Sequence, residues 1–587
     1  MAENDVFNTT NFNLSNLVSD VDSGIIALPD LQRPFVWKDK QIRDLFDSLY
    51  RGLPTGLIIL WEIGGNNDGF KPIGFDKSTT PNRLVIDGQQ RLTSLYTVFT
   101  GKPVIDKNYN ERLPKIAFNP LTDEIEVLNS SREKNPEWIN NVTEILKDDA
   151  RLLSVMRDYI SSIKEKRPDL EINENLIENN IEKMRNIRSY SFSVIELSQE
   201  LNPEQVSEIF VRINSKGKIL NQSDFILTLM SVYWDEGRNA LENFTKECKN
   251  PSTNDASPYH EIQPTPDLEH LLRPAIAYSF LRGRLKYAYL ILKGRNLENK
   301  TTTEEERNKN FEVYKGAQKI VLNLKNWHKF CYLIEGIGFI NYKDLISSKF
   351  GFYACYGLYL IGKYKFNVDY KKLERVMQKW FVFSQLTQRY SFSPESRYEQ
   401  DLIKFRQNDI DFVEILDNIM NTELTEDYWN ITLPDRLISS VNNYAGKIYT
   451  VSKIKEGNNV LFSNSTLKEH LRPETKSIKS SVEVHHIFPK NYLIKNGITE
   501  KTEFNQQANY IYIEYPDNIK ISDQSPEEYW PMMIDAMESE YIKQEIIDNY
   551  VGYYDLPNEF WNMNYSEFLE ARRVLMAKSI RRYFERL

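Results

Sequence analysis

The sequence predicts an α+β protein with several domains, because the chain is too long for one hydrophobic core and its periodicity changes twice. The 587 residues are 41% hydrophobic and 12% aromatic, whereas single cores stop growing at about 250–300 residues. Strand-like and helical patterns mix at first, helical periodicity follows, and short strands then return. We therefore expect three domains, at residues 1–235, 236–430 and 431–587.

The predicted N-terminal domain contains both strands and helices. Gly56–Trp61 and Arg83–Ile86 are expected to be buried strands, and Ser191–Leu197 alternates as a half-buried strand does. Asp87–Arg91 follows the second strand directly, and apolar residues then recur at helical spacing. This pattern predicts a strand, a tight turn at Gly88 and a helix.

Helical periodicity dominates Leu201–Asn421. Leu271–Leu281 and Tyr353–Tyr364 are apolar on nearly all sides, which is typical of buried helices, so we interpret their aromatic residues as core rather than as a base-stacking surface. In the C-terminal domain, short strands are expected at Val482–Val484 and Tyr510–Ile513. A closing helix is expected at Pro526–Glu540.

Composition and charge narrow the class of protein. The formal net charge of −9 argues weakly against a protein that coats nucleic acid, but a nuclease needs only a local basic patch. No apolar run is long enough to span a bilayer, and the first residues show no signal-peptide pattern. The three cysteines are isolated, as packing thiols in a reducing compartment are. We expect a cytoplasmic protein without a membrane partner.

The C-terminal domain contains an adjacent histidine pair, His485-His486. Asn509 follows His486 by 23 residues, Asn518 follows Asn509 by nine, and Lys520 lies close behind. Phosphodiester hydrolysis needs a base, for which neutral imidazole is suited, and a cation that stabilises charge on the phosphate. A hard ion such as Mg²⁺ keeps several waters, so one imidazole and one amide oxygen can hold it. The pattern favours a metal-dependent nuclease site over chance adjacency.

Three polar clusters stand out in the N-terminal domain: Leu28–Trp37, Asp87–Arg91 and Phe210–Gly217. Gly88 permits close backbone approach, and the following helix start offers N–H groups to an anion. Arg91 could clamp a phosphate in bidentate fashion, and Asp87 could hold a metal or act as a base. The chain has no P-loop string. Turns and caps use the same residue types, so a purely structural role stays open for each cluster.

The histidine pair and its two asparagines resemble the DUF1524 domain, an HNH branch of the His-Me finger (ββα-metal) nucleases. The resemblance implies that His486 is the general base and that His485 and Asn518 are metal ligands. It also implies that Asn509 orients the base and that Lys520 lies near the scissile phosphate. Because His485 stands where an acidic residue is expected, Mn²⁺ and Ni²⁺ are alternatives to Mg²⁺.

The N-terminal clusters resemble the DUF262 domain through the strings Gln-Arg-Pro-Phe-Val-Trp, Asp-Gly-Gln-Gln-Arg and Phe-Val-Arg-Ile-Asn-Ser. The resemblance implies a ParB/sulfiredoxin-like α+β fold that binds or hydrolyses a nucleoside triphosphate (NTP). The nucleotide-binding residues that it implies are Gln32, Arg33, Asp87, Gly88, Gln89, Gln90, Arg91, Arg212 and Asn214.

Together the two domains resemble GmrSD-type, modification-dependent (type IV) restriction endonucleases. This resemblance implies an antiphage enzyme that cuts modified foreign double-stranded DNA and uses an NTP as a regulator, with the helical middle as a connector. Two alternatives stay open: a nucleotide-regulated DNA sensor with a vestigial nuclease site, and a nuclease that acts on RNA. The DNA modification, the preferred NTP and assembly as a homodimer are left open by the sequence.

Overall fold

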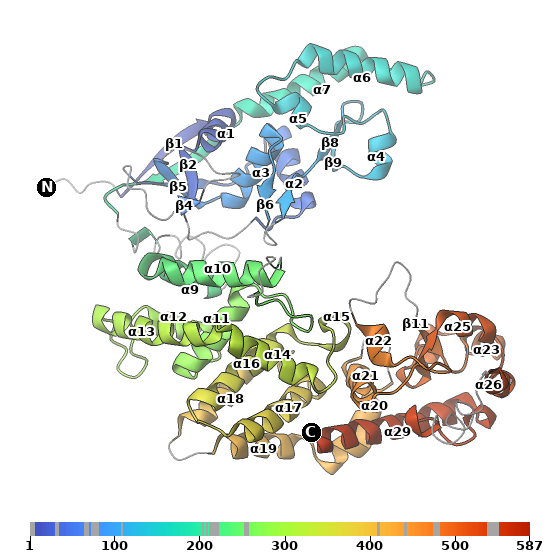
Figure 1. Cartoon of the computed structure of the whole chain (residues 1–587). Coiled ribbons are helices and arrows are strands. Elements are labelled where there is room, and N and C mark those ends of the chain that lie inside the picture. Colours follow the sequence, from blue (N-terminus) through green and yellow to red (C-terminus); the bar gives the residue numbers. More distant parts are fainter. Residues whose placement is uncertain are drawn as a thin grey trace. The chain divides into compact units, whose positions relative to one another are not determined.

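The computed structural model describes residues 6–29, 35–63, 70–71, 81–106, 110–201, 205–206, 209, 222–249, 251, 257–407, 411–438, 443–472, 482–536 and 551–587. The chain forms two compact units, Met1–Asn239 and Ala240–Leu587 (Figure 1). The predicted α+β class is confirmed, since a six-stranded sheet lies in the first unit and most of the second is helical. The division into three domains stays a prediction.

The first unit is built on a mixed sheet with the strand order β1-β10-β3-β5-β2-β4. The pairs β1–β10, β3–β5 and β2–β4 are antiparallel, and the pairs β10–β3 and β2–β5 are parallel. The strands are β1 (Phe7–Asn13), β2 (Ile26–Pro29), β3 (Ile58–Glu62), β4 (Phe70–Lys71), β5 (Arg83–Asp87) and β10 (Ser191–Leu197). The three strands predicted in this domain are thus confirmed as β3, β5 and β10.

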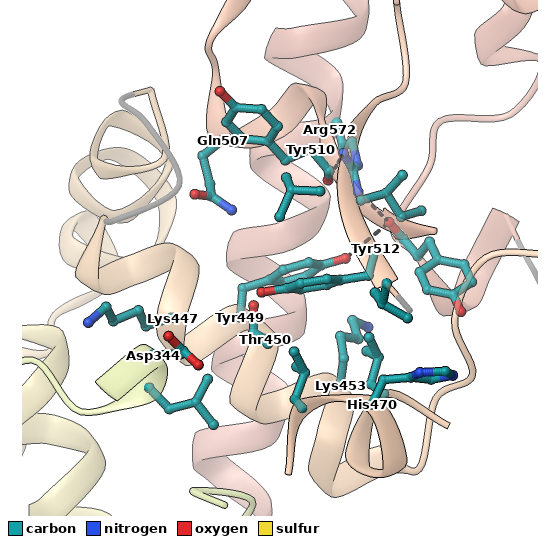
Figure 2. Close-up of a pocket in the computed structure, with 17 residues that line it drawn as sticks. Asp344, Lys447, Tyr449, Thr450, Lys453, His470, Gln507, Tyr510, Tyr512 and Arg572 are labelled. Atoms are coloured by element: carbon teal, nitrogen blue, oxygen red, sulfur yellow. Dashed lines mark hydrogen bonds between the residues drawn. The ribbon is translucent and has the colours of Figure 1, made fainter. Parts of the chain in front are cut away.

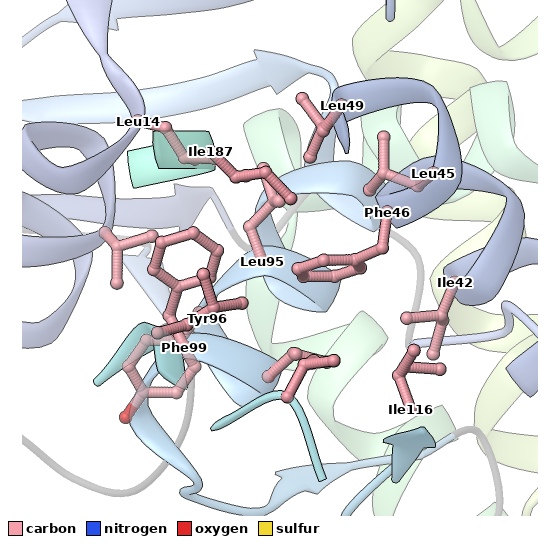
Figure 3. Close-up of a cluster of buried hydrophobic side chains, with 14 of the residues drawn as sticks. Leu14, Ile42, Leu45, Phe46, Leu49, Leu95, Tyr96, Phe99, Ile116 and Ile187 are labelled. Carbon is pink, nitrogen blue, oxygen red and sulfur yellow. The ribbon is translucent and has the colours of Figure 1, made fainter. Parts of the chain in front are cut away.

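Helices of the first unit cover the sheet and close its core. The longer ones are α1 (Leu14–Ser23), α2 (Asp39–Tyr50), α3 (Gln89–Thr100), α6 (Leu152–Lys166), α7 (Glu174–Asn186) and α9 (Gln222–Tyr233). Short elements between them are β6 (Val104–Ile105), β7 (Glu111–Arg112), β8 (Ile116–Asn119), β9 (Glu124–Val127), α4 (Ser130–Lys134), α5 (Thr143–Leu146) and η1 (Ile187–Ser189). Figure 3 shows Phe46 of α2 packed near Leu95 of α3, with Phe99 and Tyr96 on the same helix. These contacts confirm the helix predicted after Gly88.

The first part of the second unit is a helical array. Its helices are α10 (Asp235–Lys249, which crosses the unit boundary), α11 (Leu268–Phe280), α12 (Leu285–Leu292), α13 (Glu304–Val321), α14 (Leu324–Glu335), α15 (Tyr342–Leu345), α16 (Lys349–Tyr364), α17 (Tyr370–Leu386), α18 (Pro394–Ile403), η2 (Lys404–Arg406) and α19 (Phe412–Glu423). Tyr353, Tyr356 and Tyr359 of α16 are buried, as predicted for core aromatic residues. No helix in the described ranges is long and apolar enough to cross a membrane.

A buried ion-pair network holds α17, α18 and α19 together. Arg389 donates from Nε to Asp401 Oδ2 at 2.9 Å and from Nη1 to Glu423 Oε1 at 2.6 Å. The Tyr390 hydroxyl donates to the same Asp401 oxygen at 2.8 Å. Because Asp401 is fully buried and each charge has a partner, this network is structural.

The last part of the second unit surrounds a two-stranded hairpin, β11 (Val482–His486) and β12 (Tyr510–Glu514). Both strands were predicted from the sequence. The helices around it are η3 (Tyr428–Thr432), α20 (Leu433–Arg436), α21 (Tyr444–Glu456), α22 (Leu467–Leu471), α23 (Lys490–Lys495), α24 (Lys501–Phe504), η5 (Gln507–Asn509), α25 (Tyr515–Ile521), α26 (Pro526–Asp535), α28 (Val551–Tyr553), η7 (Phe560–Asn562) and α29 (Tyr565–Arg586). The predicted closing helix begins at Pro526, as expected. Residues 537–540 of that prediction lie outside the described ranges.

Candidate active site

The hairpin gives the two adjacent histidines different surroundings. His485 is opposite Ile511, and His486 is opposite Tyr510, at the end of the antiparallel ladder. Successive side chains of a strand lie on opposite faces. Glu483 therefore shares a face with His485, as the contacts described next confirm.

His485, Asn518 and Glu483 form a hydrogen-bonded chain. His485 Nδ1 lies 2.7 Å from Asn518 Oδ1, and Asn518 Nδ2 donates to Glu483 Oε2 at 2.8 Å. An ionised carboxylate only accepts hydrogen bonds, so it fixes which end of the amide faces His485. Nδ1 of His485 then carries the proton and donates to Asn518. The structure thus brings together the two predicted metal ligands.

Burial keeps the His485 imidazole neutral. The ring is 4% exposed, and this burial lowers the pKa of His485 to about 4, while the bond to Asn518 acts in the opposite direction. Its Nε2 is buried and has no hydrogen-bond partner among the described residues. A neutral imidazole keeps one nitrogen lone pair, which is what a metal ion requires of a histidine ligand.

His486 contacts a second asparagine, Asn505. The distance from His486 Nε2 to Asn505 Oδ1 is 3.1 Å, and the Tyr510 hydroxyl donates to the same oxygen at 3.0 Å. Because an amide oxygen only accepts, Nε2 carries the proton and Nδ1 keeps its lone pair. Burial lowers the pKa of His486, with Asn505 acting in the opposite direction. These features suit Nδ1 of His486 to accept a proton from water.

Asn509 contacts the backbone after His486 rather than the His486 imidazole. The prediction that Asn509 orients His486 requires a correction: its fully buried side chain contacts the backbone that follows His486, whereas Asn505 contacts the ring. Asn509 Oδ1 accepts from Phe488 N at 2.8 Å, and Nδ2 donates to Phe488 O at 3.1 Å and Phe504 O at 3.4 Å. Asn509 therefore fixes the loop that carries the base, and a short buried side chain with both amide groups used cannot also reach the imidazole.

Lys520 lies on α25, the helix that supplies Asn518. Its side chain is exposed and its Nζ donates to Asp517 Oδ1 at 2.8 Å. An exposed lysine on the ligand-bearing helix is free to swing toward a phosphate, since a surface ion pair contributes little.

A divalent ion fits the His485–Asn518 pair in part. The ion would have to replace the proton on His485 Nδ1, and the remaining imidazole proton would then lie on Nε2. Neighbouring ligands of an octahedral ion at about 2.1 Å from the metal are about 3 Å apart, close to the 2.7 Å between Nδ1 and Oδ1. The described residues contain no group of three or more histidine, cysteine or acidic side chains placed to hold a metal. An ion here would thus take an imidazole and an amide as protein ligands and complete its shell with water.

The Asp87–Arg91 turn of the first unit serves the protein backbone. Arg91 donates from Nη1 to Thr55 O at 2.6 Å and from Nη2 to Leu57 O at 2.7 Å, and Nη2 lies 3.5 Å from Asp87 Oδ2. The predicted bidentate clamp on a phosphate is therefore occupied by two carbonyl groups. Burial lowers the pKa of Arg91.

Gly88 and Gln90 complete this turn. Gly88 has a φ of +90° and precedes α3, and a Cβ there would lie 3.1 Å from the Ile58 side chain. Gln90 Oε1 accepts from Val36 N at 2.8 Å, so the turn holds the end of the first polar cluster. Gln89 is buried. The remaining predicted residues, Gln32, Arg33, Arg212 and Asn214, lie outside the described residues.

Two residues of the site were missed from the sequence. Glu483 precedes His485 by two positions, so strand alternation could have placed it on the same face. Asn505 lies between α24 and η5 in a segment without periodicity, so no sequence signal points to it.

Comparisons with known proteins agree with the N-terminal assignment. Residues 14–231 match the family model described as "GmrSD restriction endonuclease, N-terminal domain". The chain is also 24% identical to the uncharacterized protein MJ0686 of Methanocaldococcus jannaschii, over 633 aligned positions that cover 97% of this chain and 98% of the relative. The family match contains the sheet strands β2 to β10 and the Asp87–Arg91 turn. Residues 14–231 of this chain are therefore similar to the N-terminal domain of GmrSD restriction endonucleases.

Proposed function

We propose that this chain is a metal-dependent endonuclease that cuts modified foreign DNA, with the site of cleavage at the β11–β12 hairpin. The observation that carries the proposal is the pair of separate contacts made by adjacent histidines. His485 faces Asn518, as a ligand pair would. His486 faces Asn505 and retains a nitrogen lone pair, as a base would.

Each side chain of the hairpin has a role in this proposal. His486 accepts a proton from the attacking water at Nδ1, and Asn505 holds its Nε2–H. Asn509 keeps the loop after His486 in place. Glu483 orients the Asn518 amide so that its oxygen faces His485. A bound Mg²⁺, Mn²⁺ or Ni²⁺ would stabilise negative charge on the phosphate and the leaving oxygen, and Lys520 would add a positive charge nearby.

The N-terminal domain is proposed to license the cut. Its match to the N-terminal domain of GmrSD restriction endonucleases supports a role in recognising modified DNA and in binding an NTP, as in a cytoplasmic defence enzyme. The turn at Arg91 holds the loop before β3. A nucleotide that competes for this guanidinium would release that loop, which gives nucleotide binding a structural consequence.

The test is a cleavage assay of the purified full chain. The substrates are plain DNA and DNA bearing methylated, glucosylated or phosphorothioate groups. Each is incubated with Mg²⁺, Mn²⁺ or Ni²⁺, with and without each of the four NTPs. We expect metal-dependent cleavage of at least one modified DNA. If every substrate stays intact while metal binding is retained, the chain is a sensor with a vestigial site.

Two variants assign the activity to the hairpin. His486→Ala should abolish cleavage, because no other group replaces the base. His328→Ala is the matched control, since this half-buried histidine of the same unit contacts only Ser257 O at 2.9 Å among the hydrogen bonds of the described residues. Cleavage that survives His486→Ala would remove the base assignment. A parallel arm with RNA shows whether the target is RNA instead.

A further inference from the structure

The helical middle of the chain contains a strongly basic segment. Residues 315–379 carry 12 lysine and arginine residues but only four aspartate and glutamate residues, a net charge of +8 in a chain whose total is −9. The segment comprises the end of α13, all of α14, α15 and α16, and the start of α17. No step of the proposed cleavage reaction uses it.

Most of these cations lack a carboxylate partner among the described residues. Of the 12, only Lys315 and Lys349 form an ion pair within the described ranges, with Glu312 and Asp267. Like charges without partners repel one another and oppose the compact state. A polyanion that binds this segment would relieve the repulsion.

The lysines that line the cavity of about 270 Å³ beside the hairpin are different in this respect. Lys453 Nζ lies 2.8 Å from Asp555 Oδ2. Figure 2 shows Lys447 next to Asp344, whose charge acts on the Lys447 ammonium group. Both cavity lysines therefore have an opposite charge nearby, so the shortage of carboxylates belongs to segment 315–379 and not to the whole second unit.

Four lysines of the segment gather with two tyrosines where α14, α16 and α17 lie side by side (Figure 1). Lys363 Nζ donates to Asn326 Oδ1 at 2.7 Å, and the Tyr364 hydroxyl donates to the same oxygen at 2.8 Å, which ties the end of α16 to α14. Lys329 Nζ lies 5.4 Å from the Tyr370 ring centroid, which ties α14 to α17. We call this surface the lysine–tyrosine face. Its members are Lys325, Lys329, Lys363, Lys365, Tyr364 and Tyr370.

Three lysines of this face are available to an anion. Lys325, Lys329 and Lys365 are exposed, and none of them forms a hydrogen bond or ion pair among the described residues. Lys325 lies one helical turn before Lys329, on the same side of α14. Lys365 Nζ lies 5.2 Å from the Tyr278 ring centroid, and partial burial of the ammonium group lowers the pKa of Lys365. A phosphate beside Lys365 would act in the opposite direction.

The two exposed tyrosine rings hold lysines in place and are poorly suited to stack on bases. Lys363 Nζ lies 4.8 Å from the Tyr364 ring centroid, and Lys329 Nζ covers Tyr370. A base cannot stack on a ring face that an ammonium group occupies, and stacking supplies much of the affinity for single strands. Lysine binds phosphate as a point charge, without regard to sequence. The face therefore suits the backbone of a duplex better than an unpaired strand.

We propose that the lysine–tyrosine face binds the phosphate backbone of double-stranded DNA. The choice of partner rests on the proposed nuclease function. The helical middle then holds the substrate independently of sequence. Each lysine that neutralises a phosphate releases a counterion, so the slope of log K against log salt contains about −0.9 for each such contact.

The test is fluorescence anisotropy of a short labelled duplex of plain DNA, titrated with the full chain in EDTA so that no metal-dependent cleavage occurs. The double variant Lys329→Gln/Lys365→Gln should reduce the magnitude of the salt slope by about two and weaken binding at least about tenfold at low salt. Lys309→Gln/Lys578→Gln is the matched control. It makes the same change of charge at exposed lysines of α13 and α29, which contact no residue of the face among the described interactions. The control should bind the duplex as the unsubstituted chain does.

Two further probes separate the duplex from other polyanions: a labelled single strand of the same length, and vesicles of phosphatidylserine and phosphatidylcholine. Tighter binding of the single strand than of the duplex would overturn the proposal. Vesicle binding that the double variant abolishes would also overturn it.

The proposal also fails if the chain does not bind the duplex, or if the folded double variant keeps the salt slope of the unsubstituted chain. Circular dichroism establishes that each variant is folded. A chain that binds the duplex through Lys329 and Lys365 but cuts no substrate would refute the nuclease and leave this surface in place. A chain that cuts DNA while the double variant keeps its salt slope would do the reverse.

Discussion

Replacing Asn509 should mainly lower the stability of the protein, whereas replacing Asn505 should mainly lower the cleavage rate. Asn509→Ala removes three hydrogen bonds from a fully buried site and leaves the Phe488 N–H without its acceptor. Each buried polar group that loses its partner costs about 1–3 kcal/mol, so we expect a loss of about 3 kcal/mol in the free energy of unfolding. Asn505→Ala acts at a half-buried side chain and should cost only about 1 kcal/mol.

When the cleavage rate is expressed per folded molecule, Asn505→Ala should lose more activity than Asn509→Ala. Without Asn505 nothing holds the proton on Nε2 of His486, so a fraction of the imidazole presents N–H instead of a lone pair to water. General-base catalysis raises a reaction rate about 10²–10⁴-fold, and we expect Asn505→Ala to lower the cleavage rate about 10- to 100-fold. Folded Asn509→Ala should retain more activity than Asn505→Ala.

Stability is measured by urea unfolding monitored by circular dichroism. The initial rate of cleavage is measured at low temperature in buffer without urea. Asn509→Ala as stable as the unsubstituted chain would refute the loop-anchoring role. Asn505→Ala with an unchanged rate would refute the contact that fixes the tautomer of His486. Asn430→Ala is a control, since Asn430 is exposed and bonds only to Glu426 among its side-chain contacts in the described structure.

Three further predictions concern other residues of the chain. Arg91→Met should destabilise the first unit by about 2–4 kcal/mol in urea unfolding, because two carbonyl groups lose a charged donor; unchanged stability would favour a phosphate-binding role instead. Cleavage should be independent of pH above about 6.5 and fall tenfold per unit below a midpoint under 6.5, because burial lowers the pKa of His486 and the base must be neutral; a midpoint above 6.5 contradicts this. Glu483→Ala should weaken metal binding about 10- to 100-fold in calorimetry, since the Asn518 amide loses its orienting partner; unchanged affinity would exclude that role.

Local patterns were sufficient to predict the elements that carry the site. The alternation in Ser191–Leu197 matches β10 from its first residue to its last. The hairpin strands and the start of the closing helix at Pro526 also lie where the sequence predicts them. Hydrophobic periodicity and turn residues act over short distances, so these features are encoded locally.

Contacts between distant segments could not be predicted. The acceptors of Arg91 are carbonyl groups about 35 positions earlier in the chain, at Thr55 and Leu57. Every residue has a carbonyl group, so no residue type marks these two as partners. The same reason explains why Asn509 was assigned to the imidazole: its spacing is visible in the sequence, but its backbone partners at Phe488 and Phe504 are not.

The Asn505 oxygen links two parts of the second unit that the sequence does not connect. It accepts one hydrogen bond from His486 and one from Tyr510. An amide oxygen has two lone pairs, so a change in the Tyr510 bond alters the field at the His486 proton without moving the backbone. The Tyr510 hydroxyl and the candidate base are therefore coupled through one side-chain oxygen.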